Sequence, residues 1–258
     1  MKHVLFYKFN KLKARVLLYL AALRNDNDLF LYSIRHPSMS TILTEYNRRM
    51  QDKVRKRSPT FRLNDHTYHY FNHDYNATWS NERSVEIPLA LELVQRYQGR
   101  RILEVGNVLS HYFPVAHTIV DKYEQAHAVI NQDIEDFRTK DKYDLIVSIS
   151  TLEHIGWDER IKDKDKFIRV IEKLKEMLSS GGELFITLPA GYNPWVDKAI
   201  KKGLVDFDKI DFMKRRNEQN EWVQCTPVEM KHAHYNYRFH SANVVIIACT
   251  SDRLSGKL

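Results

Sequence analysis

Short apolar runs alternate with amphipathic stretches through the middle of the chain. Two stretches, residues 84–98 and 166–178, place apolar side chains at the spacing of a helix. Gly181 and Gly182 are expected to end the second helix before a strand over 183–188. Four further apolar runs are too short for helices and have the length of buried parallel strands. These runs are residues 101–105, 117–120, 127–130 and 143–149.

Three more strand-like runs follow near the C-terminus, over residues 209–214, 221–225 and 243–250. Strands that alternate with helices are typical of the α/β class, in which helices cover both faces of a mostly parallel sheet. The pattern therefore predicts an open α/β sheet in one main domain, and 258 residues are enough to build its core.

Acidic residues and a glycine stand at the ends of the expected parallel strands. Glu104 and Gly106 close the first strand, Asp121 ends the second and Asp133 follows the third. Open α/β sheets bind ligands at the carboxyl ends of their strands. There Asp121 could accept hydrogen bonds from the two hydroxyls of a ribose, and Asp133 from the exocyclic amine of adenine. The pattern predicts a cofactor that contains a nucleoside.

The loop after the first strand argues against a pyrophosphate group. Dinucleotide sites use a G-x-G-x-x-G loop, whereas here Val108 and Leu109 follow Asn107. A cofactor without phosphates is therefore expected, and a nicotinamide-dependent dehydrogenase is not.

Four phrases carry a family resemblance. ILEVG, VDKYE, QDIEDF and KYDLIVSISTLEH, in this order, resemble the class I S-adenosylmethionine-dependent methyltransferases. The flanking YNATWSNERSVEIP, GNVLSHY and STLEHIGWDE are similar to small methyltransferases encoded with enzymes of glycan and cell-surface polysaccharide assembly. The resemblance implies a Rossmann-like sheet of seven mostly parallel strands that ends in an antiparallel hairpin. The chain departs from the family's E/D-x-G-x-G motif at Val108, where the second glycine normally stands.

The resemblance also implies the cofactor, S-adenosyl-L-methionine, and its contacts. Glu104 and Gly106 would line the methionine end, and the wall beside the sulfonium would run from Leu152 to His154. The full set of implied cofactor contacts is Glu104, Gly106, Asn107, Asp121, Lys122, Asp133, Ile134, Ser150 and Leu152.

The acceptor side offers one candidate base. A sugar hydroxyl has a high pKa, so a general base would assist the transfer, and His154 after the fourth strand is the best-placed candidate. The alternative is that His154 caps the wall and touches no substrate. A carboxylate acceptor would need no base but a cation such as Arg83. Four residues are candidate acceptor contacts: Trp79, Arg83, Tyr192 and Asn193.

The function expected is O-methylation of a sugar or glycan, at a hydroxyl or a uronic carboxylate, on an acceptor that could be lipid- or nucleotide-linked. One rival is an RNA or protein methyltransferase, which the basic N-terminal part favours, although nucleic acid is the less expected partner. The other is a non-catalytic module, suggested by Val108. His66, His69 and His73 lack a carboxylate cluster, so no metal site is expected.

The basic charge belongs to the N-terminal part. The net charge is +7, but up to Arg57 thirteen Lys and Arg face four Asp and Glu, a balance of +9. We expect residues 1–74 to form a basic helical extension and a lid, and 75–258 the methyltransferase domain. Residues 8–23 predict a basic amphipathic helix, which could lie on an anionic membrane or pack on the domain or on a twin subunit. Residues 47–57 could attract phosphate or form a solvated helix face.

Cysteine usage and hydropathy suggest an intracellular setting. The two cysteines, Cys225 and Cys249, are far apart and lack metal-type spacing, so neither a disulfide framework nor a metal site is expected. No apolar run has the length of a membrane span or the form of a cleavable signal. A cytoplasmic protein is expected, with contact to the inner face of the membrane left open.

Overall fold

The computed structural model describes residues 39–237, 239 and 241–250. Eight strands form one sheet within these ranges: β3 (Ile102–Val105), β4 (Thr118–Asp121), β5 (Val129–Asn131), β6 (Tyr143–Ile149), β7 (Leu178–Pro189), β8 (Lys209–Arg215), β9 (Trp222–Cys225) and β10 (Val244–Cys249). Their order is β5-β4-β3-β6-β7-β10-β8-β9. The neighbouring pairs from β5 to β7 are parallel. The pairs made by β10, β8 and β9 are antiparallel.

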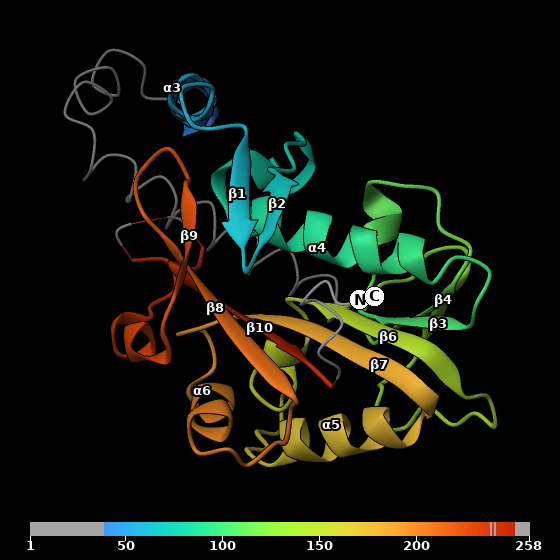
Figure 1. The fold of residues 1–258 in the computed structure, drawn as a ribbon. Helices are drawn as coiled ribbons and strands as arrows, with labels where there is room; N and C mark the ends of the chain where they lie inside the picture. The colour runs from blue at the N-terminus through green and yellow to red at the C-terminus, as the bar shows by residue number, and fades with distance from the viewer. Residues whose placement is uncertain (1–38, 238, 240, 251–258) are drawn as a thin grey trace.

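The expected Rossmann-like α/β fold is confirmed, with one strand more than the seven expected. The antiparallel hairpin is present as β8 and β10, and β9 pairs with the free side of β8. Figure 1 shows α4 (Arg83–Arg96) over one face of the sheet, and α5 (Lys166–Glu176) and α6 (Pro194–Lys201) over the other.

Alternation along the central strands builds a core on each face of the sheet. On the α5 side, Ile146 and Ile186 pack with Leu174, all fully buried. On the α4 side, Val147 packs with Leu89. Burial on both faces explains why β6 and the second half of β7, residues 184–189, appear in the sequence as nearly continuous apolar runs.

The sequence predicted that the glycines after α5 end the helix, but they lie inside β7. The helix ends at Glu176 and the strand begins at Leu178. The register between β6 and β7 shifts at this point, as in a β-bulge. A Cβ atom on Gly182 would lie 2.8 Å from the carbonyl oxygen of Tyr143, so the strands approach too closely for a side chain.

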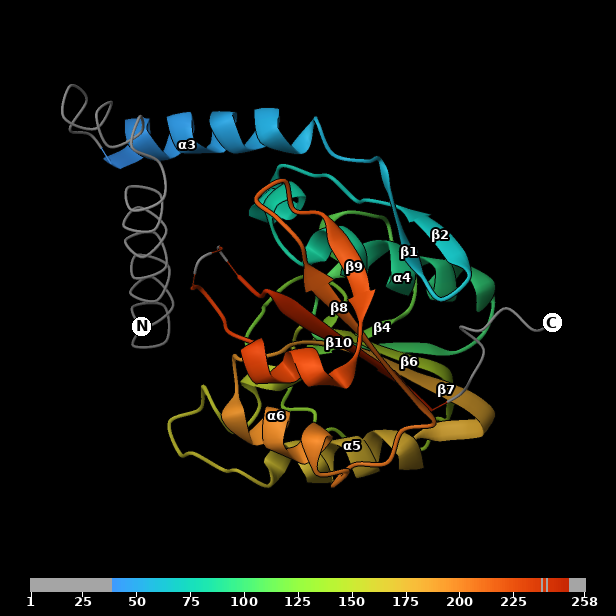
Figure 2. The same ribbon diagram turned by 60° about the vertical axis from the view of Figure 1, so that its left-hand side comes forward.

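The segment expected as a lid forms part of the scaffold. Its two short strands, β1 (Thr60–Leu63) and β2 (His66–His69), pair as an antiparallel hairpin. Phe61 and Tyr68 pack in the same core as α4 and Trp222. Figure 2 shows the hairpin beside β9 and α4. The expected domain boundary after residue 74 therefore falls within a shared core.

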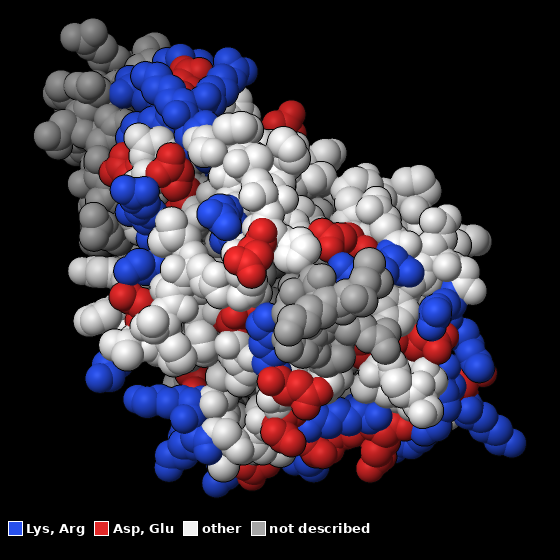
Figure 3. Space-filling view, viewed as in Figure 1, with Lys and Arg blue, Asp and Glu red and all other residues white. Residues whose placement is uncertain are grey.

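The basic run over 47–57 lies mostly on α3 (Met39–Val54), over which Figure 3 shows Lys and Arg gathered. Much of this charge is paired: Arg48 binds Glu45 and Asp52, and Lys53 binds Glu218 at 2.7 Å.

The amphipathic helix expected over 8–23 lies outside the described residues. Cys225 is partly buried and Cys249 is buried, and the two are not joined by a disulfide. None of the helices in the described ranges combines the length and the apolar character that crossing a bilayer requires.

Candidate active site

The loops after β3, β4 and β6 meet at the end of the sheet where these parallel strands have their carboxyl ends. β3 lies between β4 and β6, so the carboxyl ends of the three strands are adjacent. Gly106 joins the loops at close range: its amide donates to Val120 O at 2.9 Å, and a Cβ atom on it would lie 2.2 Å from Thr151 Oγ1. Its φ of +89° also favours glycine. A side chain at this position would separate the loops.

Glu104 shapes the loop that follows β3. The residue is fully buried. Its Oε1 accepts hydrogen bonds from the amides of Val108 and Leu109, both at 2.8 Å, and its Oε2 lies 2.7 Å from His117 Nε2. Both oxygens therefore have donors within the protein, and Glu104 supports the loop that is expected to hold the methionine end. Val108, the departure from the family motif, is buried in the α4-side core.

Asp121 and Asn107, two of the implied cofactor contacts, are hydrogen-bonded to each other. Asp121 Oδ1 accepts from the amides of Tyr123 at 2.8 Å and Glu124 at 2.7 Å, which fixes the carboxylate at the end of β4. Its Oδ2 accepts from the amide of Asn107 at 3.1 Å. Asp121 is partly exposed, so Oδ2 keeps acceptor capacity for a ligand hydroxyl.

Asp133 lies in an ionic cluster with Lys122, Glu159 and Lys166. Asp133 Oδ2 binds Lys122 Nζ at 2.7 Å and Lys166 Nζ at 2.5 Å, and both lysines also bind Glu159. Although burial disfavours its charge, hydrogen bonds from the two lysines lower the pKa of Asp133 to about 2. Its Oδ1 accepts from the amide of Glu135. An adenine amine at Asp133 would thus meet a carboxylate that two cations already bind.

Ile134 and Leu152 contribute buried side chains on the α5 side. The side chain of Ile134 is thus part of the core, so a cofactor contact of this residue would use its backbone.

Arg83 binds backbone carbonyls at the end of β6. Its guanidinium donates to Ile149 O at 2.8 Å and to Ser150 O at 3.3 Å, and it pairs with Glu86 at 3.3 Å. Ser150 has a φ of +38°, and its hydroxyl donates to Glu86 at 2.5 Å. The expectation that Arg83 positions an acceptor carboxylate is not supported, because these contacts hold the turn after β6.

His154 and Tyr192, both expected at the acceptor side, lie together. His154 Nδ1 is 2.5 Å from Asp158 Oδ2, and the Tyr192 hydroxyl donates to the same oxygen. The rings of His154 and Tyr192 meet edge to face at 4.8 Å, and Tyr192 contacts Tyr235 in the same way. The side chain of His154 is 43 % exposed. Sequence reasoning missed Asp158, although it follows His154 by four residues.

Glu153 lies within the expected wall over residues 152–154, but no role of its own was predicted for it. The residue is 2 % exposed. Its Oε1 is 3.5 Å from His154 Nε2, and its Oε2 is buried without a hydrogen-bond partner. Burial raises the pKa of Glu153 to about 7. Burial opposes the charge of His154 as well, but the carboxylates of Glu153 and Asp158 raise the pKa of His154.

Trp79 and Asn193 do not offer free side chains to an acceptor, contrary to expectation. Trp79 is buried against Val54 of α3. Asn193 is buried and caps α6, since its Oδ1 accepts from the amide of Trp195 at 2.9 Å. Its Nδ2 donates to Glu153 O at 2.8 Å. Asn193 thus ties α6 to the segment after β6.

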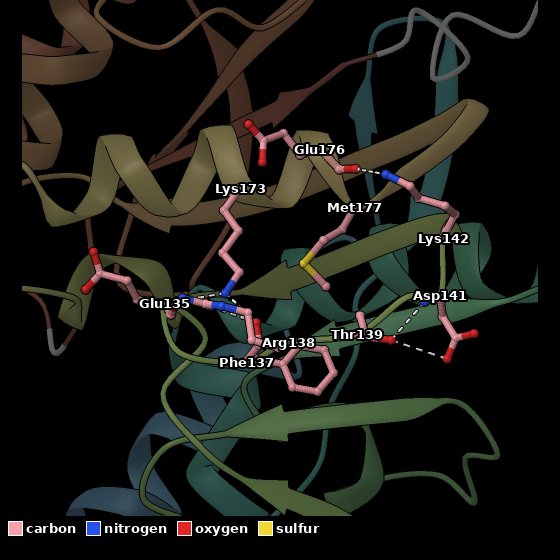
Figure 4. A pocket seen from close by; sticks show the side chains of 9 residues that line it. All are labelled: Glu135, Phe137, Arg138, Thr139, Asp141, Lys142, Lys173, Glu176 and Met177. Carbon is pink, nitrogen blue, oxygen red and sulfur yellow. Dashed lines mark hydrogen bonds between the residues drawn. The ribbon is translucent and has the colours of Figure 1, made fainter.

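A cavity of about 420 Å³ lies at the opposite edge of the sheet, beside the start of β6 and the end of α5 (Figure 4). Lys142 and Lys173, which line it, donate to backbone carbonyls at Glu176 and Glu135. Cations at these positions satisfy chain carbonyls and the end of a helix. The cavity is separate from the carboxyl ends of the strands.

The described residues contain no group of three or more His, Cys, Asp or Glu arranged for a metal ion. His73, one of the three histidines considered from the sequence, stacks on Phe71 and accepts from the amide of Tyr75 at 3.0 Å.

Solved structures of similar fold include an N-methyltransferase, NodS, from Bradyrhizobium japonicum with bound S-adenosyl-L-homocysteine. It is 14% identical, with a TM-score of 0.43, over 79% of this chain and 96% of that chain. A possible histamine N-methyltransferase from Thermotoga maritima is 14% identical, with a TM-score of 0.35, over 66% and 98%. The glycopeptide N-methyltransferase MtfA is 11% identical, with a TM-score of 0.30, over 62% and 88%.

No protein-family model and no curated protein matches the sequence. At these identities and TM-scores the likenesses carry no argument about activity, and the evidence for the fold is the strand order of the sheet itself.

Proposed function

We propose that this chain is an S-adenosyl-L-methionine-dependent methyltransferase that acts on a hydroxyl of a sugar or glycan. The observation that carries the proposal is the meeting of three strand-end loops, joined at Gly106 and Thr151, with Asp121 on one side and His154 on the other. Open α/β sheets place their ligands at this edge.

The residues at the edge fit the cofactor. Asp121 is a fixed carboxylate with a partly free oxygen, which suits a ribose diol. Gly106 keeps the backbone open for a close ligand, since no Cβ fits there. When bound, the cofactor supplies a methyl group already activated by its sulfonium, so the protein's main task is alignment.

His154 is suited to take the proton of the acceptor hydroxyl. Asp158 binds Nδ1, which fixes the ring and leaves Nε2 as the proton acceptor. Tyr192 holds Asp158 in place through its hydroxyl. A base in this position contributes about 10²- to 10⁴-fold.

A sugar hydroxyl suits the groups around His154 better than a carboxylate does. Tyr192 and Tyr235 offer ring surfaces next to carboxylates, a combination that packs on the apolar face of a sugar and binds its hydroxyls. Arg83, the cation that a uronic carboxylate would need, is bound to Glu86 and to chain carbonyls.

The basic run on α3 gives an RNA substrate no added support, because several of its cations pair with acids.

Two measurements test the proposal. Calorimetric titration of the full chain with S-adenosylhomocysteine should give saturable binding, and the absence of binding at about 1 mM ligand would overturn the cofactor assignment. Methyl transfer from labelled cofactor to cell-envelope glycans should then be seen by mass spectrometry. His154→Gln should lower the transfer at least about 100-fold while leaving cofactor affinity within about twofold. Unchanged transfer would remove His154 as the base.

A further inference from the structure

Carboxylates outnumber cations among the buried groups around the end of β6. Glu82, Glu86 and Glu153 are all buried, and Arg83 interacts electrostatically with each of them. Arg83 pairs directly with Glu86 at 3.3 Å. Within the described residues neither Glu82 nor Glu153 forms an ion pair with a lysine or arginine. The charged partner of Glu153 is instead His154, whose Nε2 lies 3.5 Å from Glu153 Oε1.

Glu153 provides a second, independent sign of a missing partner. Its Oε2 is buried and accepts no hydrogen bond in the described part of the chain. A buried carboxylate oxygen without a donor is unfavourable, and such groups persist mainly where a ligand or reaction uses them. Burial raises the pKa of Glu153 to about 7, although His154 and Arg83 act in the opposite direction.

A ligand can approach Glu153 through His154. The His154 side chain is 43 % exposed, and its Nε2 is 3.5 Å from Glu153 Oε1. Asp158 holds the other ring nitrogen. A group bound at Nε2 therefore lies close to Oε1 of Glu153, the carboxylate oxygen nearest to the ring.

Nε2 of His154 and the Glu153 carboxylate together determine which kind of ligand group can bind here. Nε2 and the Glu153 carboxylate lie close together and both accept hydrogen bonds. A hydroxyl has one hydrogen to donate, whereas a primary ammonium has three and also carries a positive charge, which a carboxylate attracts. The rings of Tyr192 and Tyr235, one beside His154 and the other beside Tyr192, favour a cation over their faces as well.

We propose that the acceptor is an amino sugar, and that its ammonium group binds Glu153 beside His154. This inference rests on the proposed function, because it names the class of acceptor at the same site. Glu153 is then a residue that determines acceptor specificity, because its carboxylate binds the amino group.

The test uses the full chain saturated with S-adenosylhomocysteine and three probes: D-glucosamine, D-glucose and N-acetyl-D-glucosamine. Carboxyl ¹³C NMR follows binding and the titration of Glu153, assigned with Glu153→Gln. Glucosamine should bind at least about 10-fold more tightly than the other two sugars. Its binding should lower the apparent pKa of Glu153, because an ammonium favours the ionised form.

Glu153→Gln keeps the shape of the side chain but removes its charge, and should bring the three affinities within about twofold of one another. Glu172→Gln, an exposed control on α5, should keep the preference of the wild type. A glucosamine preference that survives Glu153→Gln overturns the inference, as do equal affinities in the wild type or the absence of glucosamine binding at about 100 mM. In each of these cases S-adenosylhomocysteine still binds, whereas failure of the proposed function appears as loss of that binding. The melting temperature of Glu153→Gln verifies that the variant is folded.

Discussion

Gly106 lies so close to Thr151 that a Cβ atom on it would come within 2.2 Å of Thr151 Oγ1. The two residues belong to the loops after β3 and β6, and their contact sets the distance between the methionine end and the acceptor end of the proposed site. The contact gives a direct test of whether this edge binds the cofactor.

Gly106→Ala should weaken S-adenosylhomocysteine binding at least about 10-fold, because the added methyl must push the loops apart. Gly99→Ala is the matched control: its φ is +80°, close to the +89° of Gly106, but nothing lies within 4 Å of its added Cβ. Both variants carry backbone strain of about 1 kcal/mol. Calorimetry and melting temperatures compare them, and equal effects would show that the Thr151 contact has no role in binding.

Asp121→Asn should weaken S-adenosylhomocysteine binding by about 1.5 to 3 kcal/mol, the strength of hydrogen bonds to a charged group. The variant keeps an oxygen that can accept from the Tyr123 and Glu124 amides, so the turn after β4 should persist. Asp136→Asn, an exposed change in a nearby turn, should have no effect on binding. An Asp121→Asn affinity equal to that of the wild type would place the ribose elsewhere.

Asp133 should make stability depend on acid pH. Its pKa in the folded protein is about 2, below the value near 4 of an unfolded chain. A depressed pKa means that the stabilisation is complete above about pH 4 and is lost as the pH falls through 2. Asp133→Asn should therefore lower the free energy of unfolding by about 1 to 3 kcal/mol at pH 7, with the difference vanishing near pH 2.

Asp141→Asn is the control for Asp133. Asp141 pairs with Arg101 at 3.6 Å, and both side chains are exposed. Such pairs contribute about 0 to 1 kcal/mol. Urea unfolding across pH measures both variants. A constant difference between Asp133→Asn and the wild type would exclude the lysine pairing as its source.

Glu82 should make stability depend on pH in the opposite direction to Asp133. Burial, assisted by the nearby Glu86, raises its pKa from 4.5 to about 7. A raised pKa means that its contribution to stability is fully present below about pH 4.5 and is lost as the pH rises through 7. Glu82→Gln should thus stabilise the protein by about 1 to 3 kcal/mol at pH 8 and have little effect at pH 5. Glu92→Gln, on the exposed face of α4, should change neither value, and a pH-independent gain in Glu82→Gln would contradict the argument.

Asp158→Asn should lower the pKa of His154, because it removes a carboxylate that lies 2.5 Å from Nδ1. Tyr192→Phe is the companion variant: it removes a hydroxyl from the same oxygen but leaves its charge, so the pKa of His154 should stay raised. Titration of the His154 ring by NMR distinguishes the two. Equal pKa values in Asp158→Asn and the wild type would mean that Asp158 does not control His154.

Buried parallel strands were the most predictable part of the fold. β6 has the bounds that its apolar run indicates, because residues buried on both faces leave a continuous hydrophobic signal. The helix α6 was not predicted. Its signal was nevertheless present, since Asn193 followed by Pro194 is a typical helix start.

The partners of the charged residues could not be predicted in the same way. Arg83 and Asp133 have charges that suit ligands, but both bind other parts of the chain. Lys166 lies on α5 and the carbonyls that Arg83 binds lie at the end of β6, so these contacts depend on the whole fold, whereas Glu86 is only three residues from Arg83 on α4. Periodicity fixes which face of an element is buried, but it does not say which charges will meet across elements.

The Asn193 side chain has a consequence for engineering. One amide both starts α6 and anchors the carbonyl of Glu153, so the helix and the segment under His154 behave as one rigid unit. Exchanging the turn before α6 for that of another enzyme would therefore shift Glu153 too. A new acceptor preference cannot be introduced in this turn without redesigning both the start of α6 and the segment that contains Glu153.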